Sequence, residues 1–254
     1  MAKSKLDIDI RQELWSRRNF LKGGVGFLAG FSLLHSLPVK AAPAQIVVVG
    51  GGFGGATAAK YMKLWGKDSV DVTLIEANKI YTSPVLSGMV VTKQLAVDRL
   101  GFGYGRLTDV HGVKLVQDSV TAVDSALKSV TLASGGTISY DRLIVAPGID
   151  FVDVEGWDPS KLPHAWSGKQ QLEIIRDQLA DFPEGGTFVL KVPKLPYRCP
   201  PGPYERASTV ADYLRVNDKN ARVVVLDAQP DISIEGEMFH GCLLYTSDAA
   251  DDET

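Results

Sequence analysis

The chain has 254 residues, of which 45% are hydrophobic and 22% charged, and its formal net charge is −3. This is the composition of an ordinary globular protein with one or two domains. Without a basic stripe or an excess of positive charge, the sequence predicts no nucleic-acid partner. It predicts no metal centre either, because His111, His164 and His240 show no metal-ligand spacing.

Residues 1–44 have the features of an export signal rather than of a folded domain. Arg17 and Arg18 form a twin arginine followed by Phe-Leu-Lys, and an apolar stretch covers residues 23–37. That stretch is too short and too rich in glycine to span a membrane, and small residues up to Ala44 offer a cleavage site. The pattern resembles a twin-arginine signal, which predicts export of a folded protein to a periplasm and no integral membrane segment in the mature chain. An uncleaved amphipathic leader is the alternative.

A strand, a glycine-rich turn and a helix are predicted directly after this signal. Residues 46–49 are apolar and mostly valine, as in a buried parallel strand, and residues 56–64 have a helical composition that ends at Gly66. The turn between them is a G-x-G-x-x-G motif, whose glycines allow a tight turn, the approach of a pyrophosphate and close helix packing. A second apolar run, residues 70–75, ends at an acid placed to accept a ribose hydroxyl. The predicted adenine-dinucleotide site consists of Gly50, Gly52, Phe53, Gly54, Gly55, Glu76 and Ala77. The alternative is a glycine-rich turn that binds no ligand.

Residues 78–88 are predicted to form a loop because they contain a proline and a glycine. In a flavin-binding fold, this loop would run under the isoalloxazine end of the cofactor. Short strands are predicted at 115–123 and 128–132, and residues 137–140 complete a hairpin around a Gly-Gly turn. A small antiparallel insertion of this kind is typical of flavoprotein reductases.

A short apolar strand then runs into Ala146-Pro147-Gly148. This resembles the second fingerprint of two-dinucleotide flavoproteins, in which a strand meets a glycine turn near the dinucleotide. An ordinary exit from a strand into a turn is the alternative interpretation.

A second βαβ unit is predicted after a linker at 159–163. Its helices are expected at 172–182 and 207–216, and its strands at 187–192 and 221–227. In relatives that use NAD(P)H, the first turn of this unit would carry another glycine motif. Here residues 193–206 contain five prolines, which have no N–H group to bind a pyrophosphate. The turn therefore predicts that nicotinamide binding is lost.

The predicted catalytic residues, Cys199, Arg198 and Glu205, lie in or next to this proline-rich turn. The Arg198 cation would favour the Cys199 thiolate, and a single cysteine in the fold of an exported protein indicates redox function. A buried structural cysteine is the alternative. Glu205 is either an acid or base near a flavin or a first-turn carboxylate favoured by the helix dipole.

Residues 198–208, together with 54–61 and 162–166, resemble the flavoprotein subunit of flavocytochrome c sulfide dehydrogenase. The resemblance implies an α/β flavoprotein with two dinucleotide-binding domains, Rossmann-like and of the glutathione-reductase type, that is incomplete at its C-terminus. Residues 45–158 would form the FAD-binding domain and residues 159–241 part of a second, dinucleotide-binding-like domain.

Members of this family carry FAD, oxidise sulfide in the periplasm to zero-valent sulfur or polysulfide, and pass electrons to a cytochrome c subunit. The resemblance implies that Cys199 forms a redox disulfide with a cysteine far downstream, which hydrosulfide attacks. Some members bind FAD covalently through a cysteine where this chain has Ser83, so non-covalent FAD is predicted. The alternatives are an exported flavoprotein resembling sulfide:quinone reductase and a redox-inactive flavoprotein partner of a sulfur-oxidising system.

Residues 242–254 resemble the translation of a sequencing adapter, which predicts read-through that is not native. On this interpretation Cys242 is not the partner of Cys199. A genuine acidic tail is the alternative.

Overall fold

The computed structural model describes residues 42–152, 154–164, 166, 168–232 and 235–242. The predicted export signal, apart from its last three residues, and the predicted read-through beyond Cys242 therefore lie outside the described residues.

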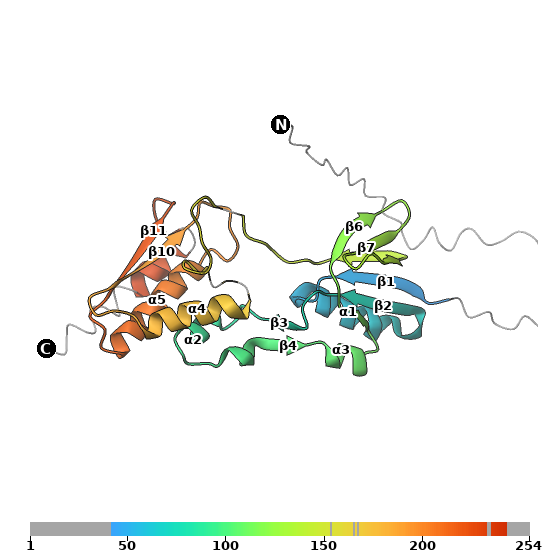
Figure 1. Ribbon diagram of the computed structural model, residues 1–254, viewed down its shortest axis with the longest axis horizontal. Coiled ribbons are helices and arrows are strands. Elements are labelled where there is room, and N and C mark those ends of the chain that lie inside the picture. Colours follow the sequence, from blue (N-terminus) through green and yellow to red (C-terminus); the bar gives the residue numbers. More distant parts are fainter. Residues whose placement is uncertain (1–41, 153, 165, 167, 233–234, 243–254) are drawn as a thin grey trace, which may run out of the picture. The chain divides into compact units, whose positions relative to one another are not determined.

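A four-stranded parallel sheet forms the centre of the first βαβ unit (Figure 1). Its strand order is β5-β2-β1-β9, and each neighbouring pair is parallel. The strands are β1 (Ala44–Val49), β2 (Val70–Ile75), β5 (Lys114–Val116) and β9 (Arg142–Val145). Helix α1 (Phe53–Gly66) and the 3-10 helix η1 (Lys67–Ser69) connect β1 to β2. The predicted order of strand, glycine turn, helix and strand is confirmed.

The two faces of this sheet are buried by different elements. On one face, Val48 packs with Ala59 of α1 and with Tyr104, next to helix α3 (Gly105–Asp109). On the other face, Val47 packs with Val130 of an antiparallel sheet. Because neighbouring residues of a strand point to opposite faces, the valine run of β1 supplies both cores.

The antiparallel sheet on the second face is the predicted insertion. It consists of β6 (Val120–Asp124), β7 (Ser129–Leu132) and β8 (Thr137–Ser139), with β7 in the middle. The hairpin between β7 and β8 is confirmed. The prediction of one strand over 115–123 was wrong, because β5 pairs with β2 of the parallel sheet and β6 pairs with β7.

Residues 78–88 are not entirely a loop, so that prediction was partly wrong. Strand β3 (Ile80–Thr82) pairs antiparallel with β4 (Gly101–Gly103), and helix α2 (Ser87–Val91) begins before the predicted loop ends. A 3-10 helix, η2 (Val97–Leu100), leads into β4. The three-residue strands are held by their partners across the sheet, which a local sequence pattern does not reveal.

The second βαβ unit consists of α4 (Lys169–Ala180), β10 (Thr187–Val192), α5 (Gly202–Val216) and β11 (Arg222–Asp227). Strands β10 and β11 pair in parallel, as predicted. Helix α5 begins five residues earlier than predicted, because the Pro201-Gly202-Pro203 stretch opens the helix, and proline is tolerated in a first turn.

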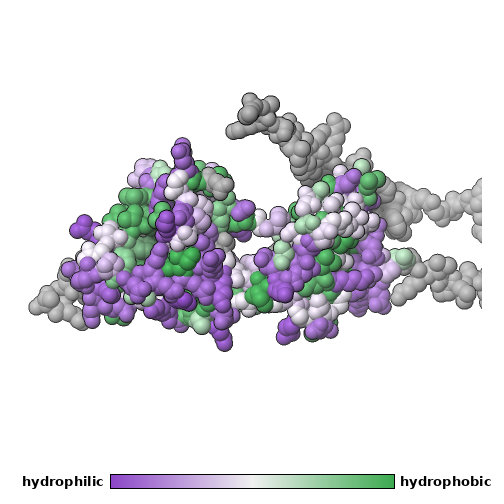
Figure 2. Space-filling model, viewed as in Figure 1, coloured by the Kyte–Doolittle hydropathy of each residue, from purple (hydrophilic) through white to green (hydrophobic). Residues whose placement is uncertain are grey.

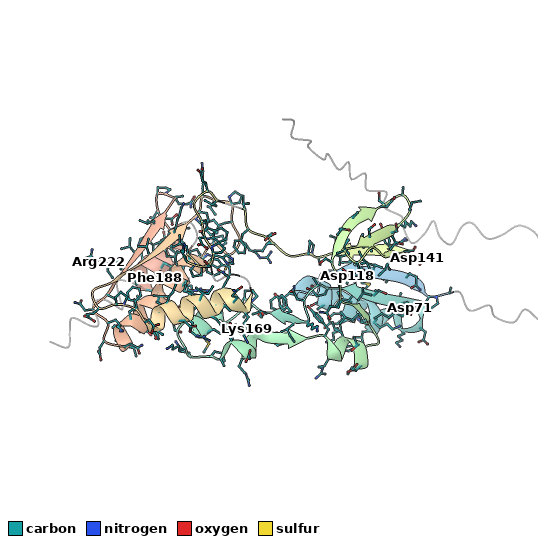
Figure 3. All side chains as sticks on the ribbon, in the orientation of Figure 1. Asp71, Asp118, Asp141, Lys169, Phe188 and Arg222 are labelled. Carbon is teal, nitrogen blue, oxygen red and sulfur yellow. The ribbon has the colours of Figure 1, made fainter. Side chains whose placement is uncertain are left out.

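The core of this unit includes side chains from the earlier elements α2 and η2. Val90, Val91, Val97 and Leu100 pack with residues of α4 and α5, including Leu172 and Val210. Lys169, labelled in Figure 3, adds an exposed ion pair from α4 to Asp98 of η2, with Nζ and Oδ1 2.6 Å apart. The buried residues of α4 are apolar, so its apolar side is turned to the core. Polar residues cover much of the face around these helices in Figure 2.

Candidate functional site

The glycine turn after β1 is packed so closely that Gly50 and Gly55 cannot be replaced. Gly50 has φ +95°, and a β-carbon there would lie 2.1 Å from the carbonyl oxygen of Ala146. A β-carbon at Gly55 would lie 1.7 Å from the Gly50 carbonyl oxygen. Both contacts are with backbone, which cannot move aside as a side chain can. The structure thus brings the first glycine motif and the Ala146-Pro147-Gly148 turn together, while their binding of a dinucleotide stays a prediction.

The N-terminus of α1 offers unoccupied N–H groups to an anion. The first described hydrogen bond of the helix runs from the Ala56 N–H to the Gly52 carbonyl oxygen, 2.9 Å apart, which leaves the N–H groups of residues 53–55 outside the helix ladder. No side chain caps this end, and its first turn carries no acid. A β-carbon at Gly52 would meet only the Tyr81 ring, at 3.4 Å. Open space, free N–H groups and the helix dipole fit the pyrophosphate of a dinucleotide.

Glu76 follows β2 and is held beside this turn. One oxygen of its carboxylate accepts the Gly51 N–H at 2.6 Å, and the other accepts the backbone and side-chain N–H groups of Asn78 at 2.8 and 2.9 Å. A carboxylate fixed at the end of the second strand, next to the glycines, is placed as a ribose acceptor requires. Ala77 is exposed directly after it.

Two tyrosines complete this region, and the sequence analysis missed both. The Tyr104 hydroxyl donates to the Gly51 carbonyl oxygen at 3.1 Å, and burial, together with the nearby Glu76 charge, raises the pKa of Tyr104 to about 12. Tyr81 packs edge-on against Phe53, with ring centroids 5.5 Å apart. Burial raises the pKa of Tyr81, and the Arg198 charge opposes this shift. No local pattern distinguishes these tyrosines from other aromatic residues.

Ser83 is buried in the turn between β3 and α2. Its N–H donates to the Leu100 carbonyl oxygen at 2.8 Å, and its hydroxyl accepts the Val85 N–H at 3.2 Å. The hydroxyl therefore stabilises its own turn, and non-covalent cofactor binding at this position stays a prediction.

The three predicted catalytic residues lie around the start of α5. Cys199 is exposed and has φ +56°, and its carbonyl oxygen accepts the Gly202 N–H at 2.9 Å. Its sulfur would lie 3.1 Å from a β-carbon at Gly202, so the thiol sits against the first turn of the helix. Arg198 and Glu205 are both exposed. The position of Glu205 in the first turn fits both interpretations of its role. Cys199 and Cys242 form no disulfide with each other.

Arg206 is a further residue of this region that the sequence analysis missed. It is 4% exposed, donates from Nη2 to the Ser87 hydroxyl at 3.1 Å, and lies 4.5 Å from the centroid of the Trp166 ring. The edge of the same ring would lie 3.2 Å from a β-carbon at Gly202. Burial lowers the pKa of Arg206 to about 10, and the Glu205 charge opposes this shift. No ion pair joins Arg206 to a carboxylate within the described part of the chain.

Two acids lie away from these sites, at the opposite end of the parallel sheet (Figure 3). Asp71 is paired with Gln45 in the ladder of β1 and β2, and its carboxylate lies 3.5 Å from the Lys114 ammonium. Asp141 accepts the Gln45 N–H at 2.7 Å. Asp71 therefore forms a surface ion pair, and Asp141 caps strand β1.

Within the described ranges, no group of three or more histidine, cysteine, aspartate or glutamate side chains could hold a metal ion. In the same part of the chain, no helix has the length and apolar character needed to cross a membrane.

The comparison with family models identifies the class. The chain belongs to the pyridine nucleotide-disulphide oxidoreductase family, whose model matches residues 44–173. The model for the central part of the flavoprotein chain of flavocytochrome c sulfide dehydrogenase matches residues 172–245. Together the two matches support the predicted resemblance to a flavoprotein of the sulfide dehydrogenase type and the predicted Rossmann-type α/β fold.

Two curated proteins are similar to parts of this chain. The mitochondrial sulfide:quinone oxidoreductase of Dictyostelium discoideum is 26% identical over 185 residues, which are 67% of this chain and 39% of that protein. Ferroptosis suppressor protein 1 of Taeniopygia guttata is 29% identical over 106 residues, which are 42% of this chain and 27% of that protein. This chain thus spans well under half of these curated relatives.

Solved structures show the same fold. The sulfide:quinone oxidoreductase of Aquifex aeolicus superimposes with a TM-score of 0.62 at 21% identity, covering 74% of this chain and 44% of that one. A ferredoxin reductase of Rhodopseudomonas palustris gives a TM-score of 0.59 at 20% identity, covering 78% of this chain and 47% of that one.

Proposed function

We propose that this chain is part of an FAD-dependent enzyme that oxidises sulfide to zero-valent sulfur or polysulfide. The observation that carries the proposal is the exposed Cys199 at the start of α5, in the turn where a nicotinamide-binding relative would have glycines. An exposed cysteine therefore occupies the position at which such a relative would bind its reductant.

The first βαβ unit would hold the FAD. The N–H groups at the start of α1 would bind the pyrophosphate, Glu76 would accept a ribose hydroxyl, and the buried Ser83 hydroxyl offers no sulfur for a thioether. Bound there, FAD would supply an acceptor that takes up two electrons and can release them one at a time.

Cys199 would act in a disulfide with a second cysteine of the whole protein. Hydrosulfide attack breaks the S–S bond, forms a persulfide on one cysteine and releases the other as a thiolate. A second hydrosulfide would remove the outer sulfur as a disulfide anion and leave two thiolates, which would pass two electrons to the acceptor as their disulfide re-forms. The Arg198 cation and the first turn of α5 would both stabilise negative charge on Cys199.

The final electron acceptor would be a cytochrome c subunit in the periplasm. The match to the flavocytochrome c sulfide dehydrogenase model and the twin-arginine pattern support this choice. If Arg17 and Arg18 direct export, replacing both with lysine should leave the protein in the cytoplasm, and fractionation of cells would show whether it does. A quinone acceptor is the alternative, which is favoured by the sulfide:quinone oxidoreductases among the relatives.

The test is anaerobic mixing of the flavin-loaded protein with sulfide, followed by flavin absorbance. The whole wild-type protein, which supplies the second cysteine, should bleach, and its Cys199→Ser variant should bleach at least a hundredfold more slowly. NADH should not bleach the flavin. Rapid bleaching by NADH, or full sulfide activity in Cys199→Ser, would contradict the proposal. Reduction of cytochrome c rather than of a soluble quinone would then identify the acceptor.

A further inference from the structure

Asp227 occupies a position in the second βαβ unit that corresponds to Glu76 in the first. It is the last residue of β11, as Glu76 directly follows β2. In a dinucleotide-binding unit, an acid at the end of the second strand faces the ribose of the ligand. Asp227 instead binds the chain's own residues.

The first of these contacts is with α5. The Tyr204 hydroxyl donates to Oδ2 of Asp227, in a short hydrogen bond. Tyr204 is itself buried in the first turn of α5, only five residues after Cys199. This contact joins the carboxylate to the C-terminal end of the proline-rich segment.

The second set of contacts runs through Gln229. Its backbone N–H and its side-chain amide both donate to Oδ1 of Asp227, at 2.9 and 3.0 Å. The same amide donates to the Pro193 carbonyl oxygen at 2.9 Å and accepts the Leu195 N–H at 3.2 Å. These contacts join the carboxylate to the N-terminal end of the segment.

One carboxylate therefore anchors both ends of residues 193–204. Cys199 lies between the anchors, where the segment is exposed and its prolines cannot form ladder hydrogen bonds. Although partial burial opposes it, hydrogen bonds from Tyr204 and Gln229 keep the pKa of Asp227 below its usual value, so the carboxylate is charged at neutral pH. A charged acceptor gives the stronger form of each of these hydrogen bonds.

We propose that Asp227 is a positioning residue for Cys199. The Asp227 carboxylate holds the proline-rich turn in place instead of binding a nucleotide ribose. The anchoring is a property of the fold alone, while its importance for sulfide oxidation rests on the proposed function. The two parts can be tested separately.

Limited trypsin digestion tests the anchoring, because Lys194 and Arg198 lie inside the segment. In the whole protein, Asp227→Ala should raise the rate of cleavage after these two residues about tenfold, as expected for the loss of a few hydrogen bonds. Asp227→Asn keeps one acceptor oxygen and should restore most of the protection. Asp231→Ala is the matched control, since Asp231 is an exposed acid of the next turn that binds His240.

Flavin reduction by sulfide tests the positioning role in the same variants. Asp227→Ala should bind FAD as the wild type does, because its contacts are all in the second unit, but should reduce it about tenfold more slowly. Unchanged cleavage in Asp227→Ala, or cleavage that rises equally in the first βαβ unit, would overturn the anchoring. Faster cleavage with an unchanged rate of flavin reduction would overturn the positioning role. If the wild type itself fails to respond to sulfide, the proposed function fails, while the cleavage result still decides the anchoring.

Discussion

Replacing Arg206 with methionine should leave the free energy of unfolding within about 1 kcal/mol of the wild-type value. The fall of the Arg206 pKa to about 10 corresponds to a cost of roughly 3 kcal/mol for burying the charged guanidinium. The hydrogen bond to Ser87 would return about 1.5–3 kcal/mol, and the contact with the Trp166 ring about 0.5–2 kcal/mol. These terms nearly cancel, and methionine fills a similar volume without a charge.

The Arg206→Lys variant should be less stable than the Arg206→Met variant. The lysine ammonium is more strongly hydrated than the guanidinium, so it is at least as costly to bury, and it lacks the planar surface that stacks on Trp166. We therefore expect Arg206→Lys to lose about 2 kcal/mol. Arg215→Met, an exposed change on the same helix, should stay within about 0.5 kcal/mol and is the matched control.

Urea unfolding followed by circular dichroism would measure these differences. The order of stability, with methionine above lysine, is the decisive result. If the lysine variant were as stable as the wild type while the methionine variant lost more than about 3 kcal/mol, a positive charge would be required at this site, and the balance of terms given above would be wrong.

Two other changes test the glycine turn and the Asp227 anchor. Gly55→Ala should lose FAD and at least about 3 kcal/mol of stability, because its β-carbon would meet the Gly50 carbonyl oxygen. The control variant Gly136→Ala should keep its FAD and its stability. Equal flavin absorbance of the two variants after gel filtration would contradict this expectation. The depressed pKa of Asp227 stabilises the fold above the unfolded pKa of aspartate, and this contribution is lost as the pH falls through the folded pKa. Unfolding midpoints measured from neutral to acid pH should therefore drop less steeply in Asp227→Asn than in the wild type.

The parts of the fold that the sequence predicted are those with a strong local pattern. The valine run of β1, the glycine turn and the run that forms β2 are each an unbroken stretch of sequence. The residues of each stretch therefore predict its structure without reference to distant partners. The prolines around Cys199 likewise predicted a turn after β10, because proline restricts its own backbone.

The parts that escaped prediction depend on partners distant in the chain. Strand β3 exists because β4 pairs with it, and the 115–123 run divides because its two halves pair with different sheets. Arg206 and Tyr104 were missed for the same reason. A guanidinium beside Trp166 or a hydroxyl on Gly51 is visible only once residues far apart in sequence have met.

The order in which the chain supplies the core of the second βαβ unit affects how the protein can be made. Helix α2 and the 3-10 helix η2 are synthesised early, but their apolar residues are covered by α4 and α5, which are synthesised later. Once residues 87–100 have left the ribosome, four apolar side chains stay exposed until residue 214 has also emerged. They are Val90, Val91, Val97 and Leu100. During this interval the nascent chain presents an apolar surface to chaperones, and a fragment cut at residue 158 would present it permanently.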